Sequence, residues 1–270
     1  MEKINIPEYE ITVLDDITRG IYGLRVLIVN LYIIHKPDDT WVLVDTGLPY
    51  SAKRIKKWAE QKMGKGSRPE SIILTHGHFD HVGAVEELIE EWDVPVYAHP
   101  LEIPFLTGQA KYPPPDPTVG GGLMSLLSAL YPHGPIDLGD SIQELPLDGT
   151  IPDLPTWNWI GTPGHSKGHI SLFRKDGRTL IAGDAISTVK PESFVNVATQ
   201  KPELHGPPAY FTPDWDMAQR SVEWLANLKP IVIAPGHGPP MVGADVSNTL
   251  DEFANKFEEV AKPGKGRYVE

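Results

Sequence analysis

The chain has 270 residues, no cysteine, and 24 Lys and Arg against 36 Asp and Glu, which gives a formal net charge of −12. The lack of cysteine excludes disulfides, thiolate metal sites and a cysteine nucleophile, and the negative charge argues against nucleic acid as a partner. Residues 1–16 are acidic and lack the apolar stretch of a secretory signal, and no apolar run is long enough to span a membrane. We therefore expect a cytoplasmic protein that has neither nucleic acid nor a membrane as a partner, and the sequence leaves its oligomeric state open.

The first hundred residues alternate between strand and helix patterns. Runs of apolar and β-branched residues predict strands, and apolar residues three and four positions apart predict helices. The first three strands are expected to form a meander, with a turn around Pro37. The expected strands are 9–14, 26–35, 41–44, 71–74 and 94–98, and the expected helices are 51–61 and 81–92.

Residues 101–135 differ in character from what precedes them. They contain a rigid proline run at 113–115, a flexible glycine run at 120–122 and a short apolar stretch at 123–130. This combination predicts a mobile flap. The alternative is an ordinary connection between two halves of the chain.

The second half is rich in strands and ends in helices. A proline- and glycine-rich loop is expected at 190–213, and Asp214 is expected to cap a helix that runs through Leu228. The remaining expected strands are 157–160, 169–173, 179–182 and 231–234, and a last helix is expected at 244–260.

A weak internal echo relates the two halves. WVLVDTG at 41–47 and TLIAGDA at 179–185 each look like a strand that ends at an aspartate, and in each half a later strand leads to a histidine. This repetition predicts an α/β fold in which two mixed β-sheets pack between helices, an αββα sandwich. We expect one domain over 1–270, made of two similar βα halves.

The segment 75–83 reads T-H-G-H-F-D-H-V-G and falls between an expected short strand and an expected helix. His76 and His78 are two positions apart, so in an extended loop they point the same way, and Asp80 and His81 follow where the chain turns. Neutral imidazoles and carboxylates are the usual ligands of zinc and similar ions. Such a cluster at a strand end has no packing use, so the segment predicts a metal site.

Together with four further motifs, this segment resembles the metallo-β-lactamase superfamily over about residues 10–240. The motifs occur in the order that the family uses. They are Asp45-Thr46-Gly47, the histidine-rich segment, Thr162-Pro163-Gly164-His165, Ala182-Gly183-Asp184-Ala185 and Pro235-Gly236-His237-Gly238.

The resemblance implies a two-metal site and assigns its ligands. His76, His78 and His165 would bind one ion, a second group would bind the other, and Asp184 would bridge the two. The second group is Asp80, His81 and His237. The ions are expected to be zinc in the first place, with iron or manganese as alternatives.

Four further residues are expected to support this site. Asp45 would orient a ligand loop, because a ligating imidazole needs a partner on its other nitrogen; the alternative is a turn-forming aspartate. His169 would support the site similarly or serve as a structural histidine. His205 and Tyr210, in the loop that follows Asp184, are candidates to line the substrate cleft, and Tyr210 is a candidate donor to an oxyanion.

The resemblance also implies a hydrolytic mechanism, in which a metal-bridging hydroxide attacks the substrate and Asp80 both ligates a metal and orients or accepts a proton from the nucleophile. The absence of cysteine excludes the β-lactamases with a cysteine ligand, and His78 in place of glutamate excludes the flavodiiron branch. Only residues 238–270 follow His237, too few for the helical glutathione-binding region of true glyoxalase II enzymes.

We therefore expect hydrolysis of a small carboxylic ester, thioester or lactone, as in the glyoxalase II and lactonase-like branches. A phosphodiester hydrolase of the same superfamily is the first alternative. The second, of another class, is a metal-binding sensor or scaffold without turnover.

Overall fold

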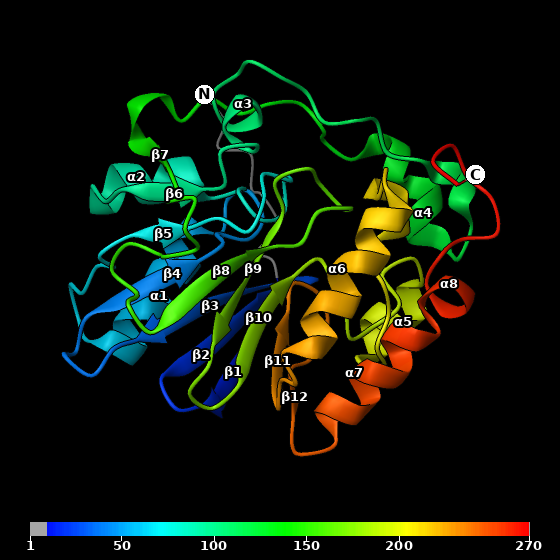
Figure 1. The fold of residues 1–270 in the computed structure, drawn as a ribbon. Helices are drawn as coiled ribbons and strands as arrows, with labels where there is room; N and C mark the ends of the chain where they lie inside the picture. Colours follow the sequence, from blue (N-terminus) through cyan, green and yellow to red (C-terminus); the bar gives the residue numbers. More distant parts are fainter. Residues whose placement is uncertain (1–9, 270) are drawn as a thin grey trace.

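Two mixed β-sheets lie face to face between helices in the computed structural model, which describes residues 10–269 (Figure 1). Tyr9, the first residue of the expected strand 9–14, lies outside the described residues, as does most of the acidic segment 1–16. Within the described residues, no helix is long and apolar enough to cross a lipid bilayer.

The first sheet has seven strands in sequence order, β1 to β7. The pairs from β1 to β4 are antiparallel and those from β4 to β7 are parallel. The strands are β1 (Ile11–Thr18), β2 (Ile21–Val26), β3 (Val29–His35), β4 (Trp41–Val44), β5 (Ile72–Ile73), β6 (Val96–Ala98) and β7 (Ile142–Glu144).

The second sheet has five strands in the order β12-β11-β10-β9-β8. Only β10 and β11 run parallel, and the other neighbours are antiparallel. The strands are β8 (Trp157–Gly161), β9 (Ile170–Arg174), β10 (Thr179–Gly183), β11 (Val232–Pro235) and β12 (Met241–Val242).

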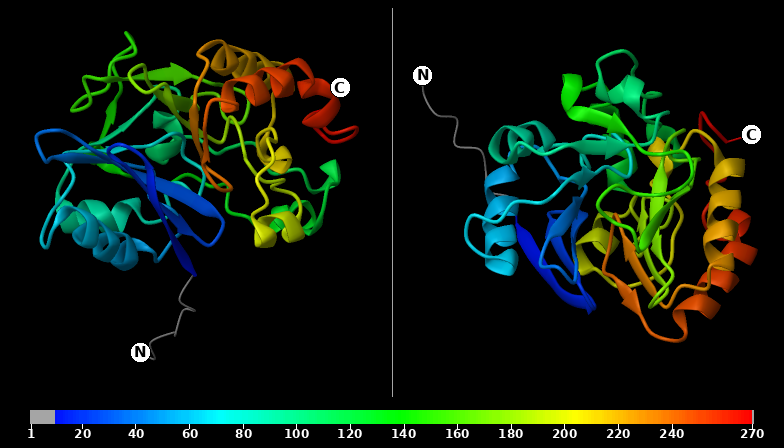
Figure 2. Two further views of the ribbon diagram at one scale, coloured as in Figure 1. Left: turned by 90° about the horizontal axis from the view of Figure 1, so that it is seen from below. Right: turned by 60° about the vertical axis from the view of Figure 1, so that its left-hand side comes forward.

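Helices cover the outer face of each sheet. On the first sheet lie α1 (Ala52–Met63) and α2 (Val85–Trp92), and on the second lie α6 (Trp215–Asn227) and α7 (Val246–Asn255), on the opposite side of the molecule (Figure 2). Three apolar clusters follow from these layers: one under α1 and α2, one between the sheets, and one under α6 and α7. The αββα sandwich predicted from the sequence is confirmed.

The segment 101–135 carries short helical turns separated by irregular chain. These are α3 (Ile103–Leu106), the 3₁₀ turn η1 (Pro117–Val119), α4 (Leu123–Leu127) and η2 (Ser128–Leu130). Another 3₁₀ turn, η3 (Gly139–Ser141), precedes β7.

Several expected boundaries were wrong for local physical reasons. The expected strand 26–35 is broken by a hairpin turn, in which Leu27 has a positive φ of 58°, so β2 and β3 are separate strands. The expected helix 81–92 begins only at Val85, because the backbone of His81 is used elsewhere: its carbonyl accepts a hydrogen bond from the Thr46 amide at 2.7 Å.

Two other differences concern the second half. The expected loop 190–213 contains α5 (Phe194–Thr199) and the 3₁₀ turn η4 (Ala209–Phe211), and the expected helix 244–260 is divided at Lys256 into α7 and α8 (Phe257–Val260). The cap predicted at Asp214 is confirmed, since its side chain accepts a hydrogen bond from the Met217 amide at 2.9 Å.

Candidate metal centre

The candidate ligands collect where two pairs of parallel strands end. In the first sheet β4 and β5 run parallel, and Asp45 and His76 follow their carboxyl ends. In the second sheet β10 and β11 run parallel, and Asp184 and His237 follow their ends. Parallel strands end at the same edge of a sheet, so the strand–aspartate and strand–histidine pattern seen twice in the sequence places both pairs at one junction. His165 joins them from the connection between β8 and β9.

Three groups of side chains have ligand atoms within 4.8 Å of one another, and every member is buried. The groups overlap, because His76 and His81 each occur in two of them. Their compositions are His76, His78 and His165; His76, His81 and Asp184; and Asp80, His81 and His237. All seven residues predicted as metal ligands are therefore brought together.

Asp184 lies between two of these groups, the one of His76, His78 and His165 and the one of Asp80, His81 and His237. Its Oδ2 lies 3.4 Å from His165 Nε2 and 3.1 Å from His237 Nε2, and its Oδ1 lies 3.3 Å from His81 Nε2. His78 Nδ1 lies 2.8 Å from His165 Nε2, and His237 Nε2 lies 3.4 Å from Asp80 Oδ2. A carboxylate in this position has oxygen atoms near both groups.

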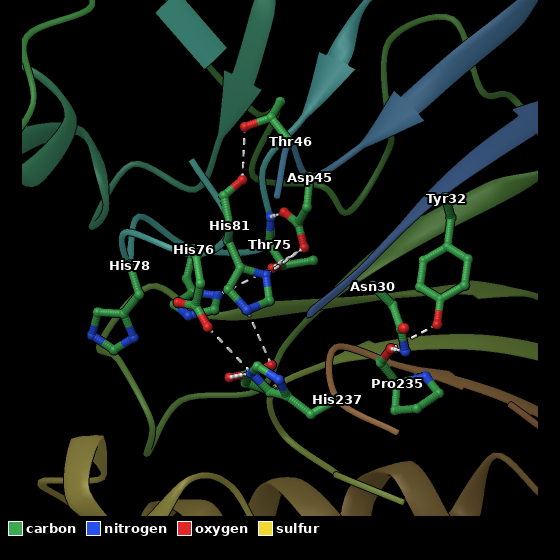
Figure 3. A network of polar contacts seen from close by, with 12 residues as sticks. Asn30, Tyr32, Asp45, Thr46, Thr75, His76, His78, His81, Pro235 and His237 are labelled. Atoms are coloured by element: carbon green, nitrogen blue, oxygen red, sulfur yellow. Dashed lines mark hydrogen bonds and ion pairs between the residues drawn. The ribbon is translucent and has the colours of Figure 1, made fainter. Parts of the chain in front are cut away.

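Most of the imidazoles are held through the ring nitrogen that faces away from the cluster. Asp45 Oδ2 lies 2.8 Å from His81 Nδ1, and the same carboxylate accepts hydrogen bonds from the Thr75 amide and hydroxyl, both at 2.8 Å (Figure 3). The Thr75 hydroxyl also lies 3.1 Å from His76 Nδ1. Such contacts set the ring orientation and the tautomer. Asp45 thus links two histidines of the cluster.

The loop that carries His237 is attached to the first sheet. His237 Nδ1 donates to the carbonyl of Ile28 at 2.8 Å. Asn30 Nδ2 donates to the carbonyls of Pro235 and Gly238 at 2.9 and 2.6 Å, and the Tyr32 hydroxyl donates to Pro235 at 2.6 Å (Figure 3). The β2–β3 turn and strand β3 of the first sheet therefore hold His237, which follows β11 in the second sheet.

His169 acts on the backbone of Asp184. Its Nε2 accepts a hydrogen bond from the Asp184 amide at 2.9 Å, and its Nδ1 lies 2.8 Å from the Thr162 hydroxyl. Burial lowers the pKa of His169 to about 4, so the ring is neutral and Nε2 is free to accept. His169 thereby fixes where Asp184 leaves its strand.

Burial also lowers the pKa values of the three histidines His76, His78 and His165. The pKa values of His76 and His165 lie well below the ordinary range because of burial and neighbouring imidazoles, and burial lowers the pKa of His78 to about 3. Neutral imidazoles have the free lone pair that a metal needs.

In the group of Asp80, His81 and His237, the pKa values of both histidines are raised instead. Burial alone would lower the pKa of His81, but Asp184, Asp45 and Asp80 raise it well above its ordinary value. The pKa of His237 is raised mainly by Asp184, against the effect of burial. This half of the cluster therefore concentrates negative charge that calls for a positive counter-charge.

The residues present fit metal ions. Three buried atoms of the cluster form no hydrogen bond within the described residues: His76 Nε2, His81 Nε2 and Asp184 Oδ1, the last two of which face each other at 3.3 Å. Leaving such atoms without hydrogen bonds is costly, and bound metal ions would accept their lone pairs. The donor set of imidazoles and carboxylates is the one preferred by zinc, iron and manganese.

A cavity of about 10 Å³ lies at the cluster, about the size that one water needs. Four aromatic side chains, which we call the aromatic cover, line it: Phe79, Tyr131, Tyr210 and Phe211. Their ring centroids are 5.8 Å apart for Phe79 and Tyr131, and 5.7 Å for Tyr131 and Tyr210. Tyr131 comes from the segment 101–135, and Tyr210 belongs to η4, so both candidate loops reach the cluster.

His205 lies elsewhere. It lines a separate cavity of about 230 Å³, together with Lys190, Glu192 and Lys262. Pro207 and Ala209 line that cavity, whereas Pro208, Tyr210 and Phe211 line the metal cavity. The segment 207–211 thus separates the two, and only Tyr210 of the two predicted lining residues is at the cluster.

The residues that contact the ligand loops but were not predicted from the sequence include Ile28, Asn30, Tyr32 and Glu102. Ile28 acts through its backbone carbonyl, which leaves no signal in a side-chain pattern. Asn30 interrupts an otherwise apolar strand, and that interruption is a signal that was available.

Comparison with known proteins identifies the family of this chain. Residues 24–237 match the family model described as the metallo-beta-lactamase superfamily. The chain is 50% identical over 244 residues to "Probable metallo-hydrolase YflN" of Bacillus subtilis (strain 168), which covers 90% of this chain and 92% of that protein.

Solved structures show the same fold. TTHA1623, in a di-iron-bound form, is 26% identical with a TM-score of 0.54, covering 83% of this chain and 95% of that one. The BLEG-1 B3 metallo-β-lactamase is 22% identical with a TM-score of 0.59, covering 82% and 92%. On its sequence and its fold, this chain belongs to the metallo-β-lactamase superfamily.

Proposed function

We propose that this protein is a hydrolase that holds two divalent metal ions and cleaves a small carboxylic ester, thioester or lactone. The observation that carries the proposal is the buried cluster in which Asp184 lies within 3.4 Å of His165 and 3.1 Å of His237. The relative named as a probable metallo-hydrolase and the relative with two irons support it.

In this proposal His76, His78 and His165 hold one ion, Asp184 reaches both, and the other ion is held by the remaining three ligands, Asp80, His81 and His237. When bound, the ions make a water molecule nucleophilic at neutral pH and polarise the bond to be broken. Zinc is our first choice. Iron and manganese are accepted by the same donors.

Asp80 is the candidate to handle the proton of the attacking water. Its side chain is buried and lines the metal cavity, with Oδ2 3.4 Å from His237 Nε2. Burial raises the pKa of Asp80 above its ordinary value, which makes the carboxylate a better proton acceptor.

Tyr210 is the candidate to stabilise the oxyanion. Its side chain lines the same cavity, and burial raises its pKa well above the ordinary value, so the hydroxyl keeps its proton at neutral pH. A neutral donor aimed at a developing negative charge stabilises the transition state most effectively where water is excluded. The aromatic cover provides that exclusion.

We further propose that the predicted flap 101–135 moves in its part around Tyr131, while Glu102 and Tyr112 of the same segment stay buried against the ligand loops. The metal cavity of about 10 Å³ is too small for any substrate, so part of the aromatic cover has to move. Phe79 and Tyr131 are only partly buried, whereas Tyr210 and Phe211 are buried. Phe79 lies between the candidate ligands His78 and Asp80 in the chain, so its displacement would disturb them, whereas Tyr131 belongs to the flap. Displacement of Tyr131 is therefore the change that opens the metal cavity to substrate at the lowest cost in free energy.

The surroundings favour an acyl substrate over a phosphodiester. A second cavity of about 260 Å³ shares Phe79 with the metal cavity and is lined largely by apolar groups, including Val82, Pro132 and Ile136. It offers room for an acyl group. No Lys or Arg of the described residues lines the metal cavity, although phosphate recognition generally uses such cations.

The test combines elemental analysis with a hydrolysis screen of lactones, thioesters and a nitrophenyl phosphodiester. It compares the wild type with His78→Ala and with His35→Ala, a histidine substitution on β3 outside the cluster. We expect two ions per chain and turnover of an acyl substrate, lost in His78→Ala and retained in His35→Ala.

Turnover of the phosphodiester alone would replace the acyl assignment. Two bound ions without turnover on any substrate would favour the sensor or scaffold. Fewer than one ion per chain after full metal loading would contradict the ligand assignment.

A further inference from the structure

Glu102 is a buried carboxylate with an unusual set of partners. It lies just before α3, is fully buried, and forms no ion pair within residues 10–269. Its Oε1 accepts hydrogen bonds from the Ser166 hydroxyl at 2.7 Å and the Gly168 amide at 2.9 Å. Its Oε2 accepts from the Gly77 amide at 3.0 Å and from the Tyr112 hydroxyl. Four donors thus surround one negative charge.

These donors lie next to the ligands of one ion. Gly77 is between His76 and His78 in the chain, and Ser166 follows His165. Tyr112 packs against His78, with ring centroids 4.4 Å apart. Glu102 therefore joins the two loops that carry all three histidines of that group, although the loops are far apart in the sequence.

The chain is fitted closely around this carboxylate. A Cβ atom on Gly168 would lie 2.8 Å from Glu102 Cγ and 2.9 Å from its Oε1, and a Cβ atom on Gly77 would lie 2.5 Å from the Tyr112 hydroxyl. Any side chain at either glycine would push the loops away from Glu102. Glycine at both positions allows the backbone amides to reach the carboxylate.

We infer that Glu102 is a positioning residue, which holds the loop of His76 and His78 against the loop of His165 at the spacing that one metal ion needs. This inference rests on the proposed metal centre and not on the proposed substrate. A buried charge without a cationic partner costs free energy. Here four hydrogen bonds offset that cost, and the gain is a preformed ligand group.

Replacement by glutamine tests this idea because it keeps the shape. Each oxygen of Glu102 accepts a hydrogen bond from one backbone amide, and a backbone amide cannot accept in return. Whichever way the glutamine side chain is turned, its NH₂ group faces the amide of Gly77 or of Gly168. One of the two loops must therefore separate from the side chain.

Asp116 provides a matched control. It is also buried, and each of its oxygens accepts a backbone amide, from Thr118 at 2.9 Å and from Arg267. Asp116→Asn thus introduces the same conflict between donors, in a place that contacts none of the candidate ligands. This control variant therefore measures how much stability a mismatched buried side-chain amide costs when the side chain does not connect the ligand loops.

The experiment measures the binding of metal to the full chain after its metal has been removed with a chelator. Zinc is titrated in competition with a chromogenic chelator, which gives two stepwise dissociation constants, and cobalt(II) is added separately for its absorption spectrum. We expect Glu102→Gln to weaken one of the two steps by about 10–100-fold and to change the cobalt spectrum. Asp116→Asn should lower the melting temperature but leave both constants unchanged.

The inference would be overturned if both zinc dissociation constants of Glu102→Gln were within about twofold of the wild-type values. It would also be overturned if Asp116→Asn lost as much zinc affinity as Glu102→Gln. If Glu102→Gln does not fold, Ser166→Ala replaces it, because this variant removes one donor and keeps the charge. We then expect a smaller loss at one step only, and an unchanged affinity would overturn the inference. Because metal binding is measured, the outcome is independent of whether the protein cleaves an ester.

Discussion

Replacing Asp45 by asparagine isolates what one buried carboxylate does for two histidines of the cluster. Asp45 follows β4 with a positive φ of 61°, a conformation that asparagine tolerates better than most residues. The substitution therefore preserves the backbone and the side-chain shape while it removes the charge. Alanine would add backbone strain to the effect.

The magnitude follows from the three contacts of the Asp45 carboxylate. Its Oδ1 accepts the Thr75 amide, and its Oδ2 contacts the Thr75 hydroxyl and His81 Nδ1, all at 2.8 Å. In asparagine, the NH₂ group must face either the Thr75 amide or His81. Because hydrogen bonds to a charged group contribute about 1.5–3 kcal/mol each, we expect metal affinity to fall by about 10–100-fold, or about 1.4–2.8 kcal/mol.

The assay is a chelator competition titration together with the rise in melting temperature on adding zinc, which reports the affinity through mass action. Asp148→Asn is the control, since Asp148 is exposed and caps a turn through the Thr150 amide at 2.9 Å. If Asp45→Asn binds both ions as tightly as the wild type, then Asp45 only shapes the turn, and our account of how His81 is held is wrong.

Three further outcomes are expected. A strong chelator should abolish hydrolysis and lower the melting temperature, and added zinc should restore both; activity that survives complete removal of metal would contradict the two-metal proposal. Tyr210→Phe should reduce kcat/KM by about 100-fold or more with little change in KM, and an unchanged value would remove Tyr210 from the mechanism. Tyr131→Ala should raise the rate of hydrolysis of bulky acyl esters relative to small ones in a competition assay, because the substitution opens the aromatic cover. A ratio of the two rates equal to that of the wild type would show that Tyr131 does not restrict access.

The parts of the centre that could be predicted from sequence are those in which chemistry is concentrated over a short stretch. His76, His78, Asp80 and His81 fall within six positions, so their spacing alone indicates a metal site. The two strand–aspartate patterns at Asp45 and Asp184 likewise end real strands, because β4 and β10 are short apolar runs that stop where a polar residue follows.

The parts that could not be predicted depend on contacts between distant segments. The hairpin turn at Leu27 is hidden inside an apolar run, and nothing local indicates that the next carbonyl, of Ile28, accepts a hydrogen bond from His237. Glu102 resembles an ordinary charged residue at the start of a helix, and its role is visible only when the loops of His78 and His165 are seen around it. His205 was a candidate to line the substrate cleft because of its neighbours in the chain, but the segment 207–211 separates it from the metal cavity.

The hydrogen bond from His237 to Ile28 spans 209 positions of the chain, and this distance has a consequence for biosynthesis. The histidine-rich segment is made early, yet synthesis must pass His237 before this residue can dock on the hairpin between β2 and β3. Contacts between such distant residues form late and slowly in folding. Tight uptake of the second ion should therefore mark chains whose two sheets have already assembled, and a truncated chain that ends before β11 should acquire metal weakly.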